Sequence, residues 1–141
     1  MLYQTEIRMI EIFKNMQTVR HRFVVSQKVY EAFQQCSGDY NPLHTKVEFA
    51  KEKGFKECVM YGNILNAFVS TLIGECLPTK DVMINSQDIT YRQPVFLNDE
   101  LDAELTVEKI YESVNVVDFK FRFNNVSGKT VARGHIQISV I

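Results

Sequence analysis

The chain has 141 residues, of which 45% are hydrophobic and 23% charged, a composition typical of a globular protein and unlike that of a disordered one. This length allows one domain to bury its core without disulfides or a structural metal, so we expect a single domain over residues 1–141. With 16 Lys and Arg against 17 Asp and Glu, the net charge is -1. That balance excludes a global attraction to nucleic acid or acidic lipid, and we expect no nucleic-acid partner.

The cysteines and the amino terminus indicate a cytoplasmic protein without a membrane partner. Cys36, Cys58 and Cys76 are odd in number and lack metal-binding spacing, which favours a reducing compartment and small buried side chains. Charged residues interrupt the apolar ones throughout residues 1–16. This pattern predicts neither a signal peptide nor a membrane-spanning helix.

The first half of the chain is predicted to contain one strand and short helices. Residues 18–25 alternate with a mostly period-two pattern, which indicates a strand. Ser26 is a suitable N-cap for a helix over about 27–37, and Gly38 lies where a left-handed residue ends such a helix. A second short helix is predicted from about residue 47 to residue 53.

The longest apolar stretch, residues 62–78, predicts a buried helix. Its apolar residues cover most of a helical surface, and Pro78 ends it. Asn63, Asn66 and Ser70 differ from the rest, because they recur at i, i+3 and i+7. They form a narrow polar stripe along one side of the predicted helix.

The second half of the chain alternates with period two and predicts antiparallel strands that are buried on one face. The predicted strands are 82–92, 101–108, 117–123 and 133–140, with a hairpin connection at 124–129. An antiparallel sheet needs a cover for its apolar face, so we expect an α+β fold in which the sheet wraps around the long central helix. An open sheet edge predicts a homodimer or a higher homo-oligomer.

The most informative motif is SGDYNPLH, residues 37–44, which places Asp39, Asn41 and His44 in one tight loop. Gly38 permits a sharp turn and Pro42 restricts the backbone, so the loop is stiff enough to aim its side chains. A carboxylate and an imidazole held in this way are suited to acid/base catalysis. An Asp-x-Asn-Pro sequence is also typical of a simple turn, and no third residue at a suitable spacing completes a metal site.

Together with Gly54, Phe55 and the YGNIL segment that opens the central helix, this motif resembles that of the MaoC-like family of (R)-specific enoyl-CoA hydratases and dehydratases. The resemblance covers nearly the whole chain and implies the hot-dog fold. It further implies a hydratase or dehydratase that interconverts trans-2-enoyl and (R)-3-hydroxyacyl thioesters. Such a reaction needs no metal or redox cofactor, and coenzyme A or an acyl carrier protein is part of the substrate.

The resemblance also implies roles for individual residues. Asp39 and His44 activate a water molecule, and Gly62 donates its backbone N–H to the thioester oxygen. Asn41 matches the motif asparagine and is expected to orient the pair. Ser70 matches a serine that lies near the pair in family members, although a serine on a buried helix equally often bonds to its own helix.

Three further residues are expected to contact the substrate. Tyr61 stands where many family members have histidine; we expect its hydroxyl at the mouth of the site, and a phenol is less suited than an imidazole to proton shuttling near neutral pH. Asn63 and Asn66 are more polar than the usual residues, so we expect a short or polar acyl chain. His21 and His135 lie among polar residues of strands and are expected to face solvent.

Two alternatives to this enzyme remain open at the level of the sequence. A non-catalytic hot-dog subunit would bind an acyl thioester or pair with an active partner, and the intact Asp39 and His44 argue against it. A hot-dog thioesterase would use the same scaffold for hydrolysis, but the SGDYNPLH motif is not the usual mark of those enzymes. One fold hosts several chemistries, so the fold alone does not decide.

Overall fold

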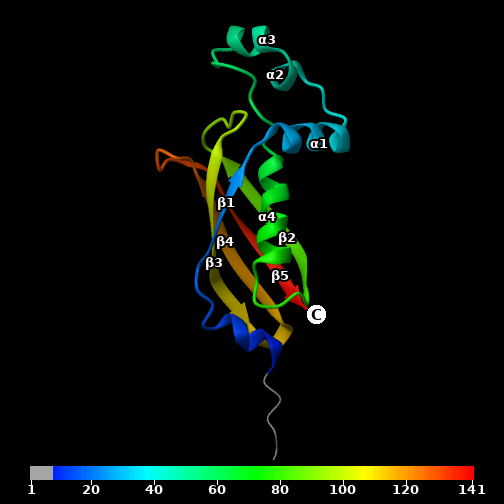
Figure 1. Ribbon diagram of the computed structural model, residues 1–141. Helices are drawn as coiled ribbons and strands as arrows, with labels where there is room; N and C mark the ends of the chain where they lie inside the picture. Colours follow the sequence, from blue (N-terminus) through cyan, green and yellow to red (C-terminus); the bar gives the residue numbers. More distant parts are fainter. Residues whose placement is uncertain (1–7) are drawn as a thin grey trace, which may run out of the picture.

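The protein is an antiparallel sheet with one long helix against one face, as seen in a computed structural model that describes residues 8–141 (Figure 1). The strands are β1 (Val19–Val24), β2 (Val82–Tyr91), β3 (Glu100–Tyr111), β4 (Val116–Asn124) and β5 (Thr130–Val140). The α-helices are α1 (Gln27–Ser37), α2 (Pro42–Thr45), α3 (Val47–Glu52) and α4 (Ile64–Glu75), and the two 3-10 helices are η1 (Met9–Phe13) and η2 (Glu112–Val114).

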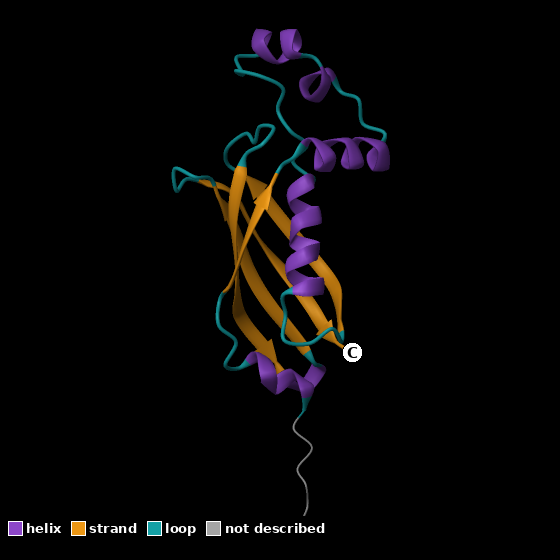
Figure 2. Cartoon of the chain, viewed as in Figure 1, coloured by secondary structure: helices purple, strands orange, loops and turns teal. Residues whose placement is uncertain are grey.

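The five strands lie in the order β1-β3-β4-β5-β2, and every neighbouring pair is antiparallel. Figure 2 shows α4 running along one face of this sheet, as a helix must do when most of its surface is apolar. The predicted α+β fold, with a sheet curving around a central helix, is therefore confirmed. The two edge strands of the sheet are β1 and β2.

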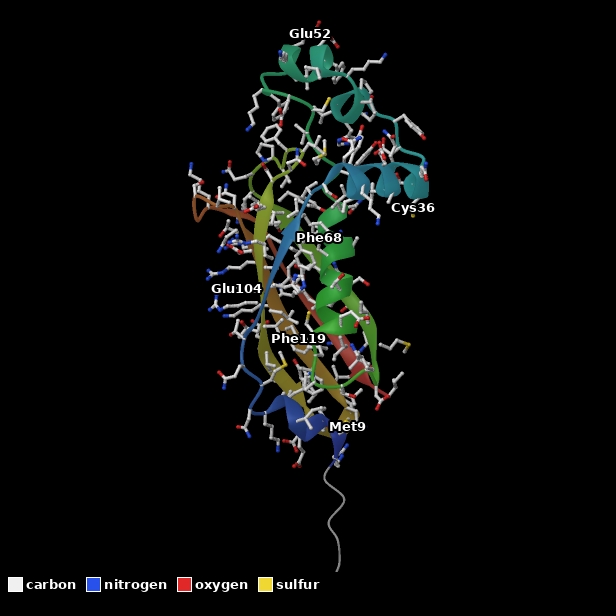
Figure 3. The ribbon with its side chains drawn as sticks, in the orientation of Figure 1. Met9, Cys36, Glu52, Phe68, Glu104 and Phe119 are labelled. Atoms are coloured by element: carbon white, nitrogen blue, oxygen red, sulfur yellow. The ribbon has the colours of Figure 1, made fainter. Side chains whose placement is uncertain are left out.

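The core lies between α4 and the inner face of the sheet. Phe119 and Phe123 of β4 are fully buried there, and Phe68 of α4 stacks on Phe23 of β1 with ring centroids 4.4 Å apart. Each large apolar side chain buried in this way stabilises the fold by about 1.5–3 kcal/mol. Glu104, by contrast, projects from the opposite face of the sheet (Figure 3), so strand alternation gives the sheet one apolar and one charged face.

One glycine is required for the pairing of the edge strand β2. Gly134 of β5 pairs with Ile89, and a Cβ at position 134 would overlap the carbonyl oxygen of Asp88 and crowd the ring of Phe121. The absence of a side chain at Gly134 therefore lets β2 approach β5 closely. This contact holds the far end of β2, including Tyr91, near the beginning of α4.

Helices α1, α2 and α3 form an overhang, residues 27–61, that extends beyond the end of the sheet at the beginning of α4 (Figure 1). Helix α1 begins and ends as predicted: Ser26 accepts a hydrogen bond from the Val29 N–H at 3.2 Å, and Gly38 is left-handed with φ of 68°. Helix α2 was not predicted inside the motif. Asn41 caps it and Pro42 occupies its first turn, so the turn-forming residues also begin a helix.

Some other expectations are also corrected. Cys36 is exposed at the end of α1 and Cys58 and Cys76 are partly exposed, so the prediction of buried cysteines is wrong, although all three thiols are free. His21 and His135 are exposed, as predicted. None of the helices among the described residues has the length and apolar character needed to cross a bilayer.

Candidate active site

A cavity of about 360 Å³ lies where the overhang meets the beginning of α4 and the end of β2. Its wall is mostly apolar, and it includes His44, Phe55, Gly62, Leu65, Tyr91 and Arg92. The overhang, the central helix and the chain after β2 each contribute to this wall. Residues that are far apart in the sequence therefore meet at one cavity.

Asp39 and His44 face each other across a gap that fits one water molecule. The Oδ2 atom of Asp39 lies 4.0 Å from Nε2 of His44. A water with hydrogen bonds of about 2.8 Å to both atoms spans this separation with an angle of about 90° at its oxygen. The His44 side chain is 16% exposed and the Asp39 side chain 47%, so the imidazole lies inside the cavity and the carboxylate lies toward solvent.

The backbone fixes which nitrogen of His44 carries a proton. Nδ1 lies 2.6 Å from the carbonyl oxygen of Val59, which is only an acceptor. Nδ1 must therefore donate, and in the neutral imidazole Nε2 presents its lone pair toward Asp39. Neutral His44 is thus oriented to accept a proton from a molecule bound between the two side chains.

The two oxygens of the Asp39 carboxylate have different roles, one in the turn and one in the site. Oδ1 of Asp39 accepts a hydrogen bond of 2.9 Å from the Asn41 N–H, which is the side-chain turn expected for this sequence. Oδ2 remains directed toward His44. Asn41 in turn accepts a bond of 2.9 Å from the Leu43 N–H, so its side chain caps α2 and supports His44 through the helix instead of touching the imidazole.

Gly62 brings a free backbone donor to the cavity at the amino-terminal end of α4. Its N–H has no hydrogen-bond acceptor among residues 8–141, and the helix dipole makes this end partly positive. A Cβ at this position would lie 2.9 Å from Cε1 of Tyr91, so a side chain would compete with the tyrosine ring for the space beside the donor. The arrangement is suited to an oxygen that gains negative charge.

Tyr61 does not lie at the mouth of the site, so that expected position is corrected. It is only 3% exposed, because its ring packs against His44 with centroids 4.2 Å apart. Its hydroxyl donates a hydrogen bond to the carbonyl oxygen of Asp39. Tyr61 therefore contacts the backbone of the loop that holds the pair.

The polar stripe of α4 lies outside the cavity. Asn66 donates to Asn63 at 2.8 Å and accepts from Gln87 of β2, and the Tyr91 hydroxyl donates to Asn63 at 3.3 Å. Ser70 is exposed and makes no side-chain hydrogen bond with any described residue. The structure thus bonds Asn63 and Asn66 to side chains of β2 and leaves Ser70 exposed, and none of the three lines the cavity.

A larger hollow of about 660 Å³ lies on the outer, charged face of the sheet, away from this cavity. His135 is there, with Asp88 and Glu108 within 4 Å, but its side chain is 58% exposed. No group of three His, Cys, Asp or Glu side chains within the described range could hold a metal ion. The smaller cavity is the better candidate, because its wall includes both His44, whose imidazole faces Asp39, and Gly62, whose N–H has no acceptor among residues 8–141.

Comparisons with known proteins identify the family of this chain. The sequence model of the MaoC like domain family matches residues 12–126, which is most of the chain. The (R)-specific enoyl-CoA hydratase of Aeromonas caviae is 29% identical over 109 residues, or 77% of this chain and 81% of the relative. A mitochondrial 3-hydroxyacyl-acyl-carrier-protein dehydratase of Arabidopsis thaliana is 27% identical over 103 residues, or 73% of this chain and 61% of the relative.

Solved structures give the same result for the fold. The (R)-hydratase of A. caviae has a TM-score of 0.82 at 27% identity, covering 89% of this chain and 95% of that one. An R-hydratase of Pseudomonas aeruginosa has a TM-score of 0.80 at 29% identity, covering 88% of this chain and 79% of that one. These neighbours are hot-dog proteins of the hydratase class, so the predicted hot-dog fold is confirmed. The chain belongs to the MaoC-like family.

The hydrogen bond from His44 to Val59 generates a testable prediction. We expect neutral His44 to carry its proton on Nδ1, because the Val59 carbonyl only accepts. Nitrogen-15 NMR distinguishes a protonated from an unprotonated ring nitrogen. The exposed His21, whose ring makes no hydrogen bond within the described part of the chain, is the internal control. A neutral His44 with its proton on Nε2 would contradict the orientation of the pair.

Proposed function

We propose that this protein is a hydratase/dehydratase that interconverts trans-2-enoyl and (R)-3-hydroxyacyl thioesters. The observation that carries the proposal is one cavity with two separate kinds of catalytic group. At one side of the cavity is His44, with Asp39 4.0 Å away toward solvent, and at another is Gly62, whose N–H has no acceptor among residues 8–141. The relatives named as an enoyl-CoA hydratase and a hydroxyacyl dehydratase support the same reaction class.

The Gly62 N–H stabilises the charge that the reaction creates on the substrate. When water adds to the β-carbon of an enoyl thioester, electron density moves to the thioester oxygen. A preorganised donor at a helix amino terminus stabilises that oxygen, and one donor of this kind typically contributes on the order of 3 kcal/mol. The mostly apolar wall strengthens the effect, because it keeps other water away from the charge.

Asp39 and His44 transfer the protons of the reaction. The oxygen of the bound water forms the new bond to the β-carbon while one of its protons passes to the pair. The pair then returns a proton to the α-carbon, so H and OH are added and the pair regains its starting charge. Two titrating groups that share one water are coupled, and the transferred proton belongs to the pair as a whole. The reverse sequence dehydrates the (R)-3-hydroxyacyl thioester.

The carrier part of the substrate is coenzyme A or an acyl carrier protein, and the site holds no other cofactor in this proposal. The cavity is near the small end of the range of about 300–1,000 Å³ for ligand pockets, which supports a short acyl chain. Its apolar wall does not support the expectation of a polar chain, since Asn63 and Asn66 lie outside it. The three free thiols support a reducing, cytoplasmic location.

The test is the loss of enoyl absorbance when crotonyl-CoA is incubated with the protein in water. We expect Asp39→Asn and His44→Ala each to lower kcat by at least about two orders of magnitude, the usual scale for an acid/base group. Val126→Ala is the control, because Val126 lies on the exposed hairpin. A twelve-carbon enoyl-CoA should be a poorer substrate than crotonyl-CoA. Release of free thiol from acyl-CoA would identify a thioesterase, and full activity of both variants would refute the proposed pair.

The role of Gly62 has its own test, with Gly74 inside α4 as the control glycine. Gly62→Ala should lower kcat/KM by at least about tenfold, since its Cβ competes with Tyr91 beside the N–H donor. A Cβ on Gly74 meets nothing within 4 Å, so Gly74→Ala should retain activity and gain about 0.5–1 kcal/mol of stability. Equal activity of the two variants would show that Gly62 is not needed beside the substrate.

We also propose that the protein is a homodimer joined through β2. Within residues 8–141 this ten-residue edge strand pairs only with β5, and it exposes Met83 (56%) and Ile84 (41%). Pairing of two such edges would hide both the free backbone groups and these side chains. Sedimentation velocity should give the dimer mass for the wild type and the monomer mass for Ile84→Lys. Val126→Lys, on an exposed hairpin, should stay dimeric, and a monomeric wild type at micromolar concentration would exclude this interface.

A further inference from the structure

The backbone of the catalytic loop is held by two tyrosines that reach it from different elements. The Tyr30 hydroxyl, from α1, donates to the carbonyl oxygen of His44 at 2.8 Å. The Tyr61 hydroxyl, from the segment before α4, donates to the carbonyl oxygen of Asp39. Each member of the proposed pair therefore has its main-chain carbonyl bound by one phenol.

A single side chain connects these two phenols. Nε2 of Gln34 lies 3.1 Å from the Tyr30 hydroxyl and 3.2 Å from the Tyr61 hydroxyl. Gln34 is on α1, one helical turn after Tyr30, and the two tyrosine rings stack with centroids 5.6 Å apart. The three side chains thus form one connected group beneath the loop.

The direction of every hydrogen bond in this group is determined by its ends. A carbonyl oxygen only accepts, so each phenol must donate its one proton to a carbonyl of the loop. Each phenol oxygen is then left as an acceptor, and the NH₂ group of Gln34 has two protons, one for each. Burial also raises the pKa of Tyr30, which keeps this donor protonated. Only a donor at position 34 is compatible with both bonds to the loop.

We propose that Gln34, Tyr30 and Tyr61 are positioning residues that set the separation of Asp39 and His44. This inference rests on the proposed function, because the separation matters only if the pair acts on one water. In this inference, three side chains outside the motif hold the main chain at Asp39 and at His44. A displacement of about 1 Å in such a pair lowers the rate by up to about a hundredfold.

The decisive variant is Gln34→Glu, which keeps the shape of the side chain and replaces the two donors with acceptors. The phenols must then turn their protons toward the new carboxylate and release the loop carbonyls. We expect kcat with crotonyl-CoA to fall by about ten- to a hundredfold, with KM changed by less than about twofold. The ratio of variant to wild-type kcat should rise as the pH is lowered, because a protonated carboxyl regains a donor.

Gln35→Glu is the matched control. Gln35 is the next residue of α1 and is exposed, so the substitution makes the same change of charge without entering the group. Its kcat should stay within about twofold of the wild type at every pH. Equal behaviour of the two variants, or a loss in Gln34→Glu that does not depend on pH, would overturn the inference.

A second variant and a structural readout keep the inference testable if Gln34→Glu does not fold. Tyr61→Phe removes one phenol without changing the charge, and it should also lower kcat more than KM. Crystal structures of the wild type and the folded variant measure the Asp39 to His44 separation without any assay. A wild type that hydrates no enoyl thioester refutes the proposed function, whereas an active wild type with an unchanged pair in the variant refutes the positioning group alone.

Discussion

The burial of α4 against the inner face of the sheet is the constraint on which the rest of the structure depends. Phe68 stacks on Phe23 across this contact, and the amino-terminal end of the helix therefore has a fixed position at one end of the sheet. That end carries the N–H of Gly62, which has no acceptor in the described part of the chain. Apolar burial stabilises this position of the helix, and it uses none of the polar groups that the reaction needs.

The overhang depends on polar contacts to a much greater degree. Its motif loop is held through main-chain atoms: Val59 accepts from His44, and the phenols of Tyr30 and Tyr61 donate to the loop carbonyls. These bonds leave the reactive atoms of Asp39 and His44 unused, which a catalytic pair requires. The turn interpretation and the catalytic interpretation of the motif are therefore compatible, since the two oxygens of Asp39 serve one purpose each.

Local signals in the sequence predicted the elements well, because their causes are local. The ends of α1 follow from a capping serine and a left-handed glycine, and the sheet follows from period-two alternation. Helix α2 was missed because Asn41 and Pro42 are equally suited to a turn and to a helix start. Tyr61 was misplaced because no local pattern reveals that its ring packs on His44 and that its hydroxyl meets Asp39.

The sequence by itself determined the fold class and the family, together with the residue types that carry acid/base chemistry. Only the tertiary structure decided that Asp39 lies 4.0 Å from His44, and that His44 shares a cavity with Gly62. It also decided that Asn63, Asn66 and Ser70 lie outside that cavity. The physical reason is the range of the interactions. Caps, turns and alternation act over a few residues, whereas a proton-transfer site requires sub-ångström agreement between segments that meet only after the core has packed.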